Sequence, residues 1–355
     1  SKKKAPIKKA APIKKAALAK KAAPTNTKKA ALPKKAPLPK KAVLPKKAAA
    51  AKKEVVEGTF PVVAIGASAG GLEAMMELLQ FLPPNTGMAF IYVQHLSPDH
   101  KSMLTEILSK KTKMKVQEID DMDKIKPDNV FVIPYNKGIE VTDGHIKLIP
   151  RSESTSAISI DILFSSLAHA QKERVIGIIL SGSASDGTVG IKDIKHEGGL
   201  TFAQDDSAKF TSMPHSAIAA DVVDFILSPK EIALELARLS KHPFVKTIGA
   251  KTNTEDLIDN GNPDLKIILN QLHKSKGVDF GVYKMNTIKR RIIRRMVLYK
   301  ITLLKEYAKL LSQKKEEIDI LYQDLLINVT NFFRDTDTTS TPTGARIRCT
   351  SLTLC

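Results

Sequence analysis

Three residues of the kinds that cooperate in nucleophilic catalysis each follow an apolar run of this sequence. Ser68 comes after PVVAIGA, His95 after MAFIYVQ, and Asp186 lies in the loop after RVIGIIL. In a Ser-His-Asp centre the imidazole takes the hydroxyl proton, while the carboxylate orients the imidazole and stabilises its charged form. The residue types therefore predict a serine-hydrolase triad, provided that the fold brings the three together.

The stretch around Ser68 is typical of a nucleophile elbow, in which a serine stands on a sharp turn between a strand and a helix. An apolar run precedes the turn, and an amphipathic helix begins at about Leu72. Peptide N–H groups of such a turn can stabilise an oxyanion, and one good donor is worth roughly 3–4 kcal/mol. The candidate donors are Ala69, Gly70 and Gly71.

Each triad residue also has a structural interpretation. Ser68 or Asp186 could cap the helix that follows it, and His95 could be a buried, hydrogen-bonded histidine. The chain order Ser, His, Asp also differs from the Ser, Asp, His order of α/β-hydrolases. The combination on one predicted sheet edge favours a catalytic site over three separate structural roles.

Cofactor and metal sites are not expected. GASAGG resembles a dinucleotide-binding turn, but Ser68 occupies the second glycine position, and Gln94 and His95 stand where a ribose-binding acid would end the next strand. The acidic run at residues 120–123 lacks the remaining ligands of an EF-hand loop. We therefore predict no metal and no cofactor.

Short apolar runs alternate with helical patterns over residues 58–242, which predicts a doubly wound parallel sheet. GIEVTDGHIKLI predicts a hairpin that turns at Asp143-Gly144. Ligands of open α/β sheets bind at the carboxyl ends of the strands, near the switch in strand order. Ser68, His95 and Asp186 should therefore meet at that edge.

The second half of the chain has a different pattern. Residues 243–262 lose the periodicity and predict a linker, residues 263–335 predict a small all-α domain of four short helices, and residues 336–355 predict an unstructured end. The two cysteines, Cys349 and Cys355, lie in that end.

One predicted helix, NTIKRRIIRRMVLYK, carries a cluster of arginines. Arg290 and Arg294 share one face, as do Arg291 and Arg295, because each pair is four residues apart. These side chains could bind acidic partner helices or phosphates. They could also form a solvated basic face, which the spacing alone favours.

The formal net charge of +19 comes from the first 53 residues, which hold 19 lysines and no acidic residue. The rest of the chain has equal numbers of basic and acidic residues. We predict that residues 1–57 form a disordered Lys/Ala/Pro tail. The tail could contact a polyanion or act as a spacer. Few cysteines and no long apolar run predict a cytoplasmic protein without a membrane span.

Several separated motifs resemble chemotaxis protein-glutamate methylesterases of the CheB type. They are IGASAGG, VQHLSPDH, FVIP, IDILFSSLA, GIILSGSASDGTVG and FAQD. The resemblance implies that Ser68, His95 and Asp186 are the triad and that glutamate methyl esters on chemoreceptor helices are hydrolysed. Deamidation of receptor glutamines is a related activity of that family. Ser183 stands where the family often has Met, and residues 156–161 differ from its usual Arg-Pro-Ser-Val-Asp stretch, which bears on substrate contacts.

Residues 264–335 resemble the N-terminal helical domain of CheR-type receptor methyltransferases, through KRRIIRRM and LLINVTNFFRD. The resemblance implies receptor binding by Arg290, Arg291, Arg294 and Arg295. It ends after Asp335, so we expect a truncated or frameshifted fusion without methyltransferase activity. A CheB-type receiver domain is expected to be absent. The alternative to the esterase is a non-catalytic module that binds a receptor or a polyanion.

Overall fold

The structure is a computed structural model of the 355-residue chain. It describes residues 60–95, 103–135, 137–142, 144–150, 159–243, 245 and 258–326. The predictions for the lysine-rich tail and for the end after residue 326 lie outside these ranges. Among the helices described, none is long and apolar enough to cross a membrane.

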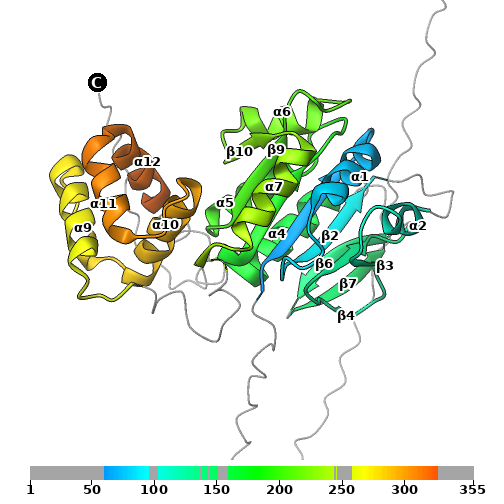
Figure 1. Cartoon of the computed structure of the whole chain (residues 1–355), viewed down its shortest axis with the longest axis horizontal. Coiled ribbons are helices and arrows are strands. Elements are labelled where there is room, and N and C mark those ends of the chain that lie inside the picture. The colour runs from blue at the N-terminus through cyan, green and yellow to red at the C-terminus, as the bar shows by residue number, and fades with distance from the viewer. Residues whose placement is uncertain are drawn as a thin grey trace, which may run out of the picture. The chain divides into compact units, whose positions relative to one another are not determined.

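A seven-stranded parallel sheet forms the centre of the first folded region (Figure 1). Its strand order is β10-β9-β8-β1-β2-β5-β3. The chain moves from β1 to one side of the sheet and later from β8 to the other, so the switch in strand order lies between β1 and β8. The doubly wound parallel sheet is confirmed. Its strands are β1 (Val62–Ala67), β2 (Ala89–Gln94), β3 (Lys115–Glu118), β5 (Asn129–Val132), β8 (Val175–Ile179), β9 (Leu200–Gln204) and β10 (Phe225–Leu227).

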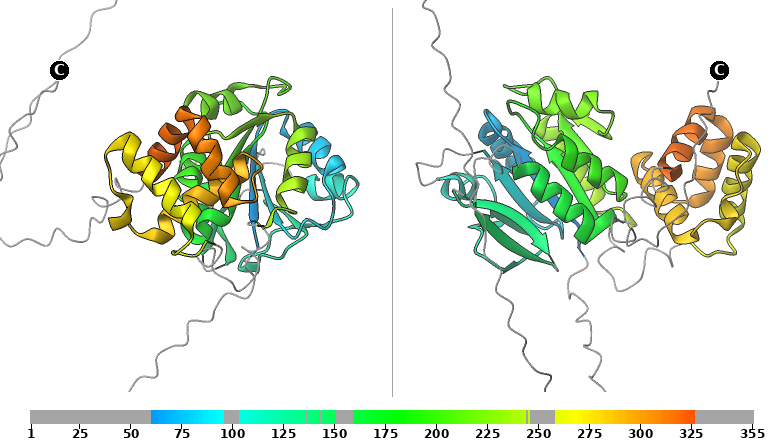
Figure 2. Two further views of the ribbon diagram at one scale, coloured as in Figure 1. Left: turned by 60° about the vertical axis from the view of Figure 1, so that its left-hand side comes forward. Right: turned by 180° about the vertical axis from the view of Figure 1, so that it is seen from behind.

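Helices cover both faces of the sheet, because the strands are apolar on both sides. In β1, Val63 and Ile65 join the core that includes α1 and α7, whereas Val62 and Ala64 face the core that includes α4 and α5. The right-hand view of Figure 2, which looks at the molecule from behind, shows α4 and α5 in front of the sheet. The helices here are α1 (Gly71–Phe81), α2 (Leu104–Ser109), α4 (Ser159–Gln171), α5 (Thr188–His196), α6 (Ser212–Ala219) and α7 (Pro229–Leu239), with the 3₁₀ turn η1 (Lys172–Arg174).

A separate antiparallel sheet has the order β4-β7-β6, formed by β4 (Asp123–Lys124), β7 (His145–Pro150) and β6 (Lys137–Thr142). β6 and β7 pair so that Thr142 lies opposite His145. The predicted hairpin is therefore confirmed, with Gly144 at a positive φ of 76° in its turn. β4 was not expected, since two residues are too short to show a strand periodicity.

The second folded region contains α9 (Pro263–Lys276), η3 (Phe280–Val282), α10 (Met285–Leu298), α11 (Leu304–Gln313) and α12 (Lys315–Leu326). Its helices correspond to the four predicted from the sequence. Ile288, Ile292 and Met296 of α10 are at most 1% exposed. Their spacing of four residues places them on one helical face, which explains why α10 packs into a core despite its many charges.

Candidate active site

Ser68 and His95 directly follow β1 and β2, and Asp186 lies in the loop after β8; these three strands are neighbours in the sheet. The His95 N–H donates to the Ala67 carbonyl at 3.1 Å, which continues the pairing of β1 with β2. The Ser68 N–H donates to the Ser181 carbonyl at 3.0 Å, just beyond the pairing of β1 with β8. These residues lie at the carboxyl ends of the strands, where the strand order switches between β1 and β8. The sequence analysis predicts a ligand site at this edge.

His95 and Asp186 form a direct pair. The distance from His95 Nε2 to Asp186 Oδ2 is 2.6 Å, and the two side chains are 21% and 1% exposed. An ionised carboxylate only accepts hydrogen bonds, so Nε2 carries the proton of this contact and Nδ1 is the nitrogen left for the nucleophile. The imidazole is thus held by the carboxylate while part of it remains open to solvent.

Asp186 is fixed from a second direction by the first turn of α4. The Ile160 N–H donates to Asp186 Oδ2 and the Asp161 N–H donates to Oδ1, both at 3.0 Å. These N–H groups belong to the positive end of the helix dipole, which favours a carboxylate. The interpretation of Asp186 as a cap of the following helix is wrong, because the N-cap of α5 is Gly187, without a side-chain cap.

Ser68 stands at the turn between β1 and α1. The Gly71 N–H donates to the Ser68 carbonyl at 3.0 Å, and Gln94 Nε2 donates to the same carbonyl at 3.3 Å. Ser68 does not cap α1, whose N-cap is Gly70. Among the described residues the Ser68 hydroxyl makes no hydrogen bond, so the structure holds the backbone of the residue and leaves its oxygen available.

The candidate oxyanion donors differ from one another. The N–H of Gly71 is engaged with the Ser68 carbonyl. The N–H groups of Ala69 and Gly70 have no acceptor within the part of the chain that the structure describes. Gly70 has a φ of 73°, and a Cβ added to it would lie 2.7 Å from the Ser181 hydroxyl, so the turn requires glycine there.

Ser181 is a supporting residue that the sequence reasoning missed. Its hydroxyl donates to the Ala69 carbonyl at 2.8 Å and accepts from the Phe210 N–H at 3.0 Å. It therefore connects the turn of Ser68 to the loop after β9. The sequence could have indicated this role, because Ser181 directly follows the apolar run of β8, as His95 directly follows that of β2.

Tyr92 and Gln94, both in β2, stabilise the turn that contains Ser68. The Tyr92 hydroxyl donates to Gln94 Oε1 at 2.7 Å, and Gln94 in turn donates to the Ser68 carbonyl. Burial, with a smaller contribution from the charge of Glu73, raises the pKa of Tyr92 well above its usual range. The phenol therefore stays a neutral donor and keeps Gln94 oriented.

The predicted arginine cluster lies away from this edge. Arg291, Arg294 and Arg295 are 3%, 4% and 8% exposed, so the interpretation of a solvated basic face is wrong for these three. The Arg290 side chain is 34% exposed and forms an ion pair with Glu173 at 3.3 Å. Whether any of the four also binds a receptor stays a prediction.

Arg291 contacts the C-terminal end of α5, and Arg294 contacts the short segment between α5 and β9. Arg291 donates to the carbonyls of Lys195, at 3.1 Å, and His196. Arg294 donates to the Gly199 carbonyl at 3.0 Å and is paired with both Asp224, at 2.5 Å, and Asp324, at 3.0 Å. Carbonyls at a helix C-terminus are the negative end of its dipole and favour cations.

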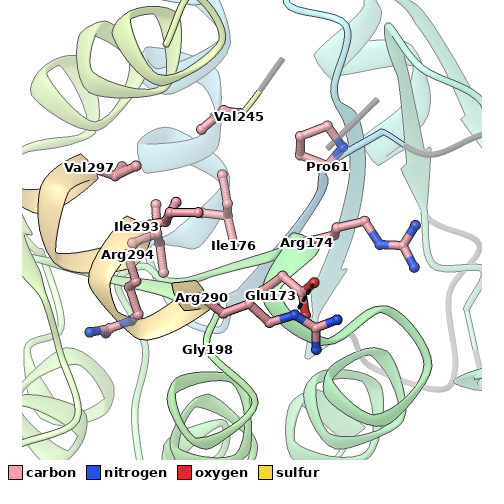
Figure 3. A pocket seen from close by; sticks show the side chains of 11 residues that line it. Pro61, Glu173, Arg174, Ile176, Gly198, Val245, Arg290, Ile293, Arg294 and Val297 are labelled. Atoms are coloured by element: carbon pink, nitrogen blue, oxygen red, sulfur yellow. Dashed lines mark ion pairs between the residues drawn. The ribbon is translucent and has the colours of Figure 1, made fainter. Parts of the chain in front are cut away.

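The remaining arginine acts within the helical region. Arg295 forms two hydrogen bonds to the carboxylate of Glu317, at 2.8 and 2.5 Å, and the Tyr307 hydroxyl donates to the same carboxylate at 2.8 Å. The Glu317 side chain is fully buried. Arg290, Arg294 and Ile176 line a separate cavity of about 50 Å³. Figure 3 shows Arg290 next to Glu173, its ion-pair partner, on one side of this cavity.

Two family models match the two folded regions of the chain. The model of the CheB methylesterase family matches residues 63–236, and that of the CheR methyltransferase all-alpha domain matches residues 263–326. A Leptospira interrogans protein that bears the name protein-glutamate methylesterase/protein-glutamine glutaminase is 36% identical over 186 residues, which cover 52% of this chain and 96% of that protein. The doubly wound α/β chain therefore belongs to the CheB-type protein-glutamate methylesterases.

Other relatives extend the comparison. A Geobacter sulfurreducens protein-glutamate methylesterase/protein-glutamine glutaminase is 31% identical over 194 residues, covering 52% of this chain and 54% of that protein. An uncharacterized 104.1 kDa protein of Rhodobacter capsulatus is 32% identical over 255 residues, covering 66% of this chain and 26% of that protein. The crystal structure of the Thermotoga maritima CheB methylesterase catalytic domain has a TM-score of 0.47 and 27% identity, covering 51% of this chain and 98% of that domain.

Proposed function

We propose that this chain hydrolyses glutamate methyl esters on the helices of chemoreceptors, with Ser68 as nucleophile, His95 as general base and acid, and Asp186 as the orienting carboxylate. The observation that carries the proposal is the 2.6 Å contact between His95 and Asp186 beside the turn of Ser68, at the switch in strand order. The family of the chain supplies the ester as substrate.

The reaction begins when Ser68 Oγ attacks the ester carbonyl and its proton passes to His95. The tetrahedral oxyanion is stabilised by the N–H groups of Ala69 and Gly70 at the N-terminus of α1. As the carbon–oxygen bond to the methoxy group breaks, His95 returns the proton and methanol leaves. A water molecule then hydrolyses the acyl-enzyme by the same proton transfers, which regenerates Ser68 and releases the glutamate side chain.

Glutamine deamidation would follow the same steps, with the amide nitrogen leaving as ammonia in place of methanol. Asp186 stabilises the imidazolium in each proton transfer, because its carboxylate is buried against His95 and is held by two peptide N–H groups of α4. No step requires a group other than the side chains and N–H groups named and water.

The test is the release of methanol from methylated chemoreceptor membranes by the full chain. Ser68→Ala should abolish release while leaving the circular dichroism spectrum and the unfolding midpoint unchanged. Ser109→Ala is a matched control, because Ser109 is exposed at the end of α2 and its hydroxyl donates only to the Glu106 carbonyl in the described structure. Undiminished release in Ser68→Ala would refute the triad, and wild-type chain that binds receptors without releasing methanol would favour the non-catalytic alternative.

A further inference from the structure

Asp161 lies in the first turn of α4, beside the catalytic carboxylate but outside the triad. Its N–H donates to Asp186 Oδ1 at 3.0 Å, and its own carboxylate oxygen Oδ1 accepts the N–H of Gly190 at 2.7 Å. Gly190 is in the first turn of α5, four residues after Asp186. The Asp161 backbone thus holds the catalytic carboxylate, and its side chain holds the helix that follows that carboxylate in the chain.

The contact between the two helices is unusually close at this point. A Cβ added to Gly190 would lie 2.8 Å from the Asp161 carbonyl oxygen and 3.0 Å from its Cα, so only glycine fits. Ile160, the neighbour of Asp161, would be 2.9 Å from a Cβ at Gly187. Both ends of the short segment from Asp186 to Gly190 are therefore fixed against the first turn of α4.

We propose that Asp161 is a positioning residue of the esterase, whose carboxyl group holds Gly190 and so keeps the Asp186 carboxylate in register with His95. This inference rests on the proposed triad. Without the Asp161 side chain, the first turn of α5 loses its hydrogen bond to α4. Among the described residues, Asp186 then keeps the two peptide N–H groups of α4 and His95 as partners. A misplacement of about 1 Å in a catalytic group can cost on the order of a hundredfold in rate.

The electrostatic setting fits this role. Burial, and then the charge of Asp186, raise the pKa of Asp161 to about 6, although the N–H of Gly190 acts in the opposite direction. The titratable groups that face this carboxyl are Asp186, from the loop after β8, and beyond it His95, from the end of β2. From α5, the N–H of Gly190 donates to the Asp161 carboxylate. The carboxylate of Asp193, also in α5, instead accepts from the Ser165 hydroxyl, one turn further along α4.

The experiment compares Asp161→Ala with Asp161→Asn in the methanol-release assay. Asp161→Ala should lower kcat by tenfold to a hundredfold with little change in KM. Asp161→Asn keeps an oxygen for Gly190 and should recover kcat to within about threefold of the wild type. Because Asn removes a negative charge beside Asp186, a positively charged imidazole is less favoured, and the acid limb of the kcat/KM profile should move to lower pH.

Asp193→Asn is the matched control, since that carboxylate also joins α5 to α4, at 2.6 Å from the Ser165 hydroxyl, but does not touch the loop of Asp186. It should leave both kcat and the pH profile unchanged. Wild-type kcat in Asp161→Ala would overturn the proposal, as would a pH profile of Asp161→Asn that superimposes on the wild type.

If Asp161→Ala fails to fold, the pH profile of Asp161→Asn decides alone, because a purely structural residue would not move the acid limb. Ser68→Ala is measured in parallel. Full methanol release by Ser68→Ala would overturn the triad itself. Loss of release there, together with unaltered Asp161 variants, would overturn only the role of Asp161.

Discussion

The N-terminus of α4 and the C-terminus of α5 use the same electrostatic effect with opposite sign. At α4, the N–H groups of Ile160 and Asp161 hold the Asp186 carboxylate. At α5, carbonyls of its last turn accept the guanidinium of Arg291. A helix end thus places an anion at the catalytic edge of the sheet and a cation in the arginine network.

The two regions differ in what they leave available. The arginine network uses its donors within the chain: Arg294 meets Asp224, Asp324 and the Gly199 carbonyl. At the catalytic edge the backbone of Ser68 is fully held, yet its hydroxyl has no partner among the described residues. Groups that are all satisfied and buried indicate a structural role, whereas a positioned but unsatisfied nucleophile beside a paired base indicates chemistry.

The largest expected effect is at the catalytic edge. Asp186→Asn should keep an oxygen acceptor for α4 but lose the charge that stabilises the imidazolium. By analogy with other triads the rate should fall about 10⁴-fold, which corresponds to roughly 5 kcal/mol in activation free energy. Steady-state methanol release measures it. A loss below tenfold would mean that Asp186 serves mainly to hold α4, and the contrast between the two regions would fail.

The next effect tests the arginine network. Arg294→Ala removes the guanidinium that pairs with the buried carboxylates of Asp224 and Asp324, and leaves Asp224 only the longer contact with Lys195, at 3.7 Å, as an ion pair in the described structure. Breaking such a buried pair costs about 3–5 kcal/mol of stability. The free energy of unfolding, from urea titration of the full chain, measures it.

Arg290→Ala is the matched comparison on the same helix. Its ion pair with Glu173 is partly exposed and longer, at 3.3 Å, so the change should be about 1 kcal/mol or less. Equal effects of Arg290→Ala and Arg294→Ala would show that burial does not set the strength of this network.

An effect smaller than that of Arg294→Ala concerns Asp161 and pH. The pKa of its carboxyl is about 6 in the folded chain, above the value of about 3.9 in an unfolded chain. Its contribution to stability is therefore present below about pH 4 and is lost as the pH rises through 6. Asp161→Asn, which does not ionise, should gain stability relative to the wild type over this range.

Since Asp161 is only half-buried, solvent screening reduces this gain to about 1–2 kcal/mol. Urea unfolding at pH 4, 5, 6 and 7 measures it, with Asp193→Asn as the control that should show a constant offset. A stability difference between Asp161→Asn and the wild type that does not change with pH would contradict a raised pKa of this carboxyl.

The sequence by itself determined the elements and the order of the catalytic residues. Apolar runs with polar residues at their ends located β1, β2 and β8, and the parallel arrangement then required Ser68, His95 and Asp186 to lie at one edge. The same pattern located the hairpin and the four helices of the second region. These features depend on local periodicity and on a topological rule, both of which a single sequence displays.

Only the tertiary structure decided which charges meet. The spacing of Arg291, Arg294 and Arg295 showed that they share helical faces, but Asp224 is 70 residues away from Arg294 in the sequence. Likewise, nothing local to Asp186 indicated that α4, rather than α5, supplies its N–H donors. The role of a charged side chain depends on the partners that packing brings within about 3 Å of it. Such proximity in space cannot be deduced from the separation of two residues in the sequence.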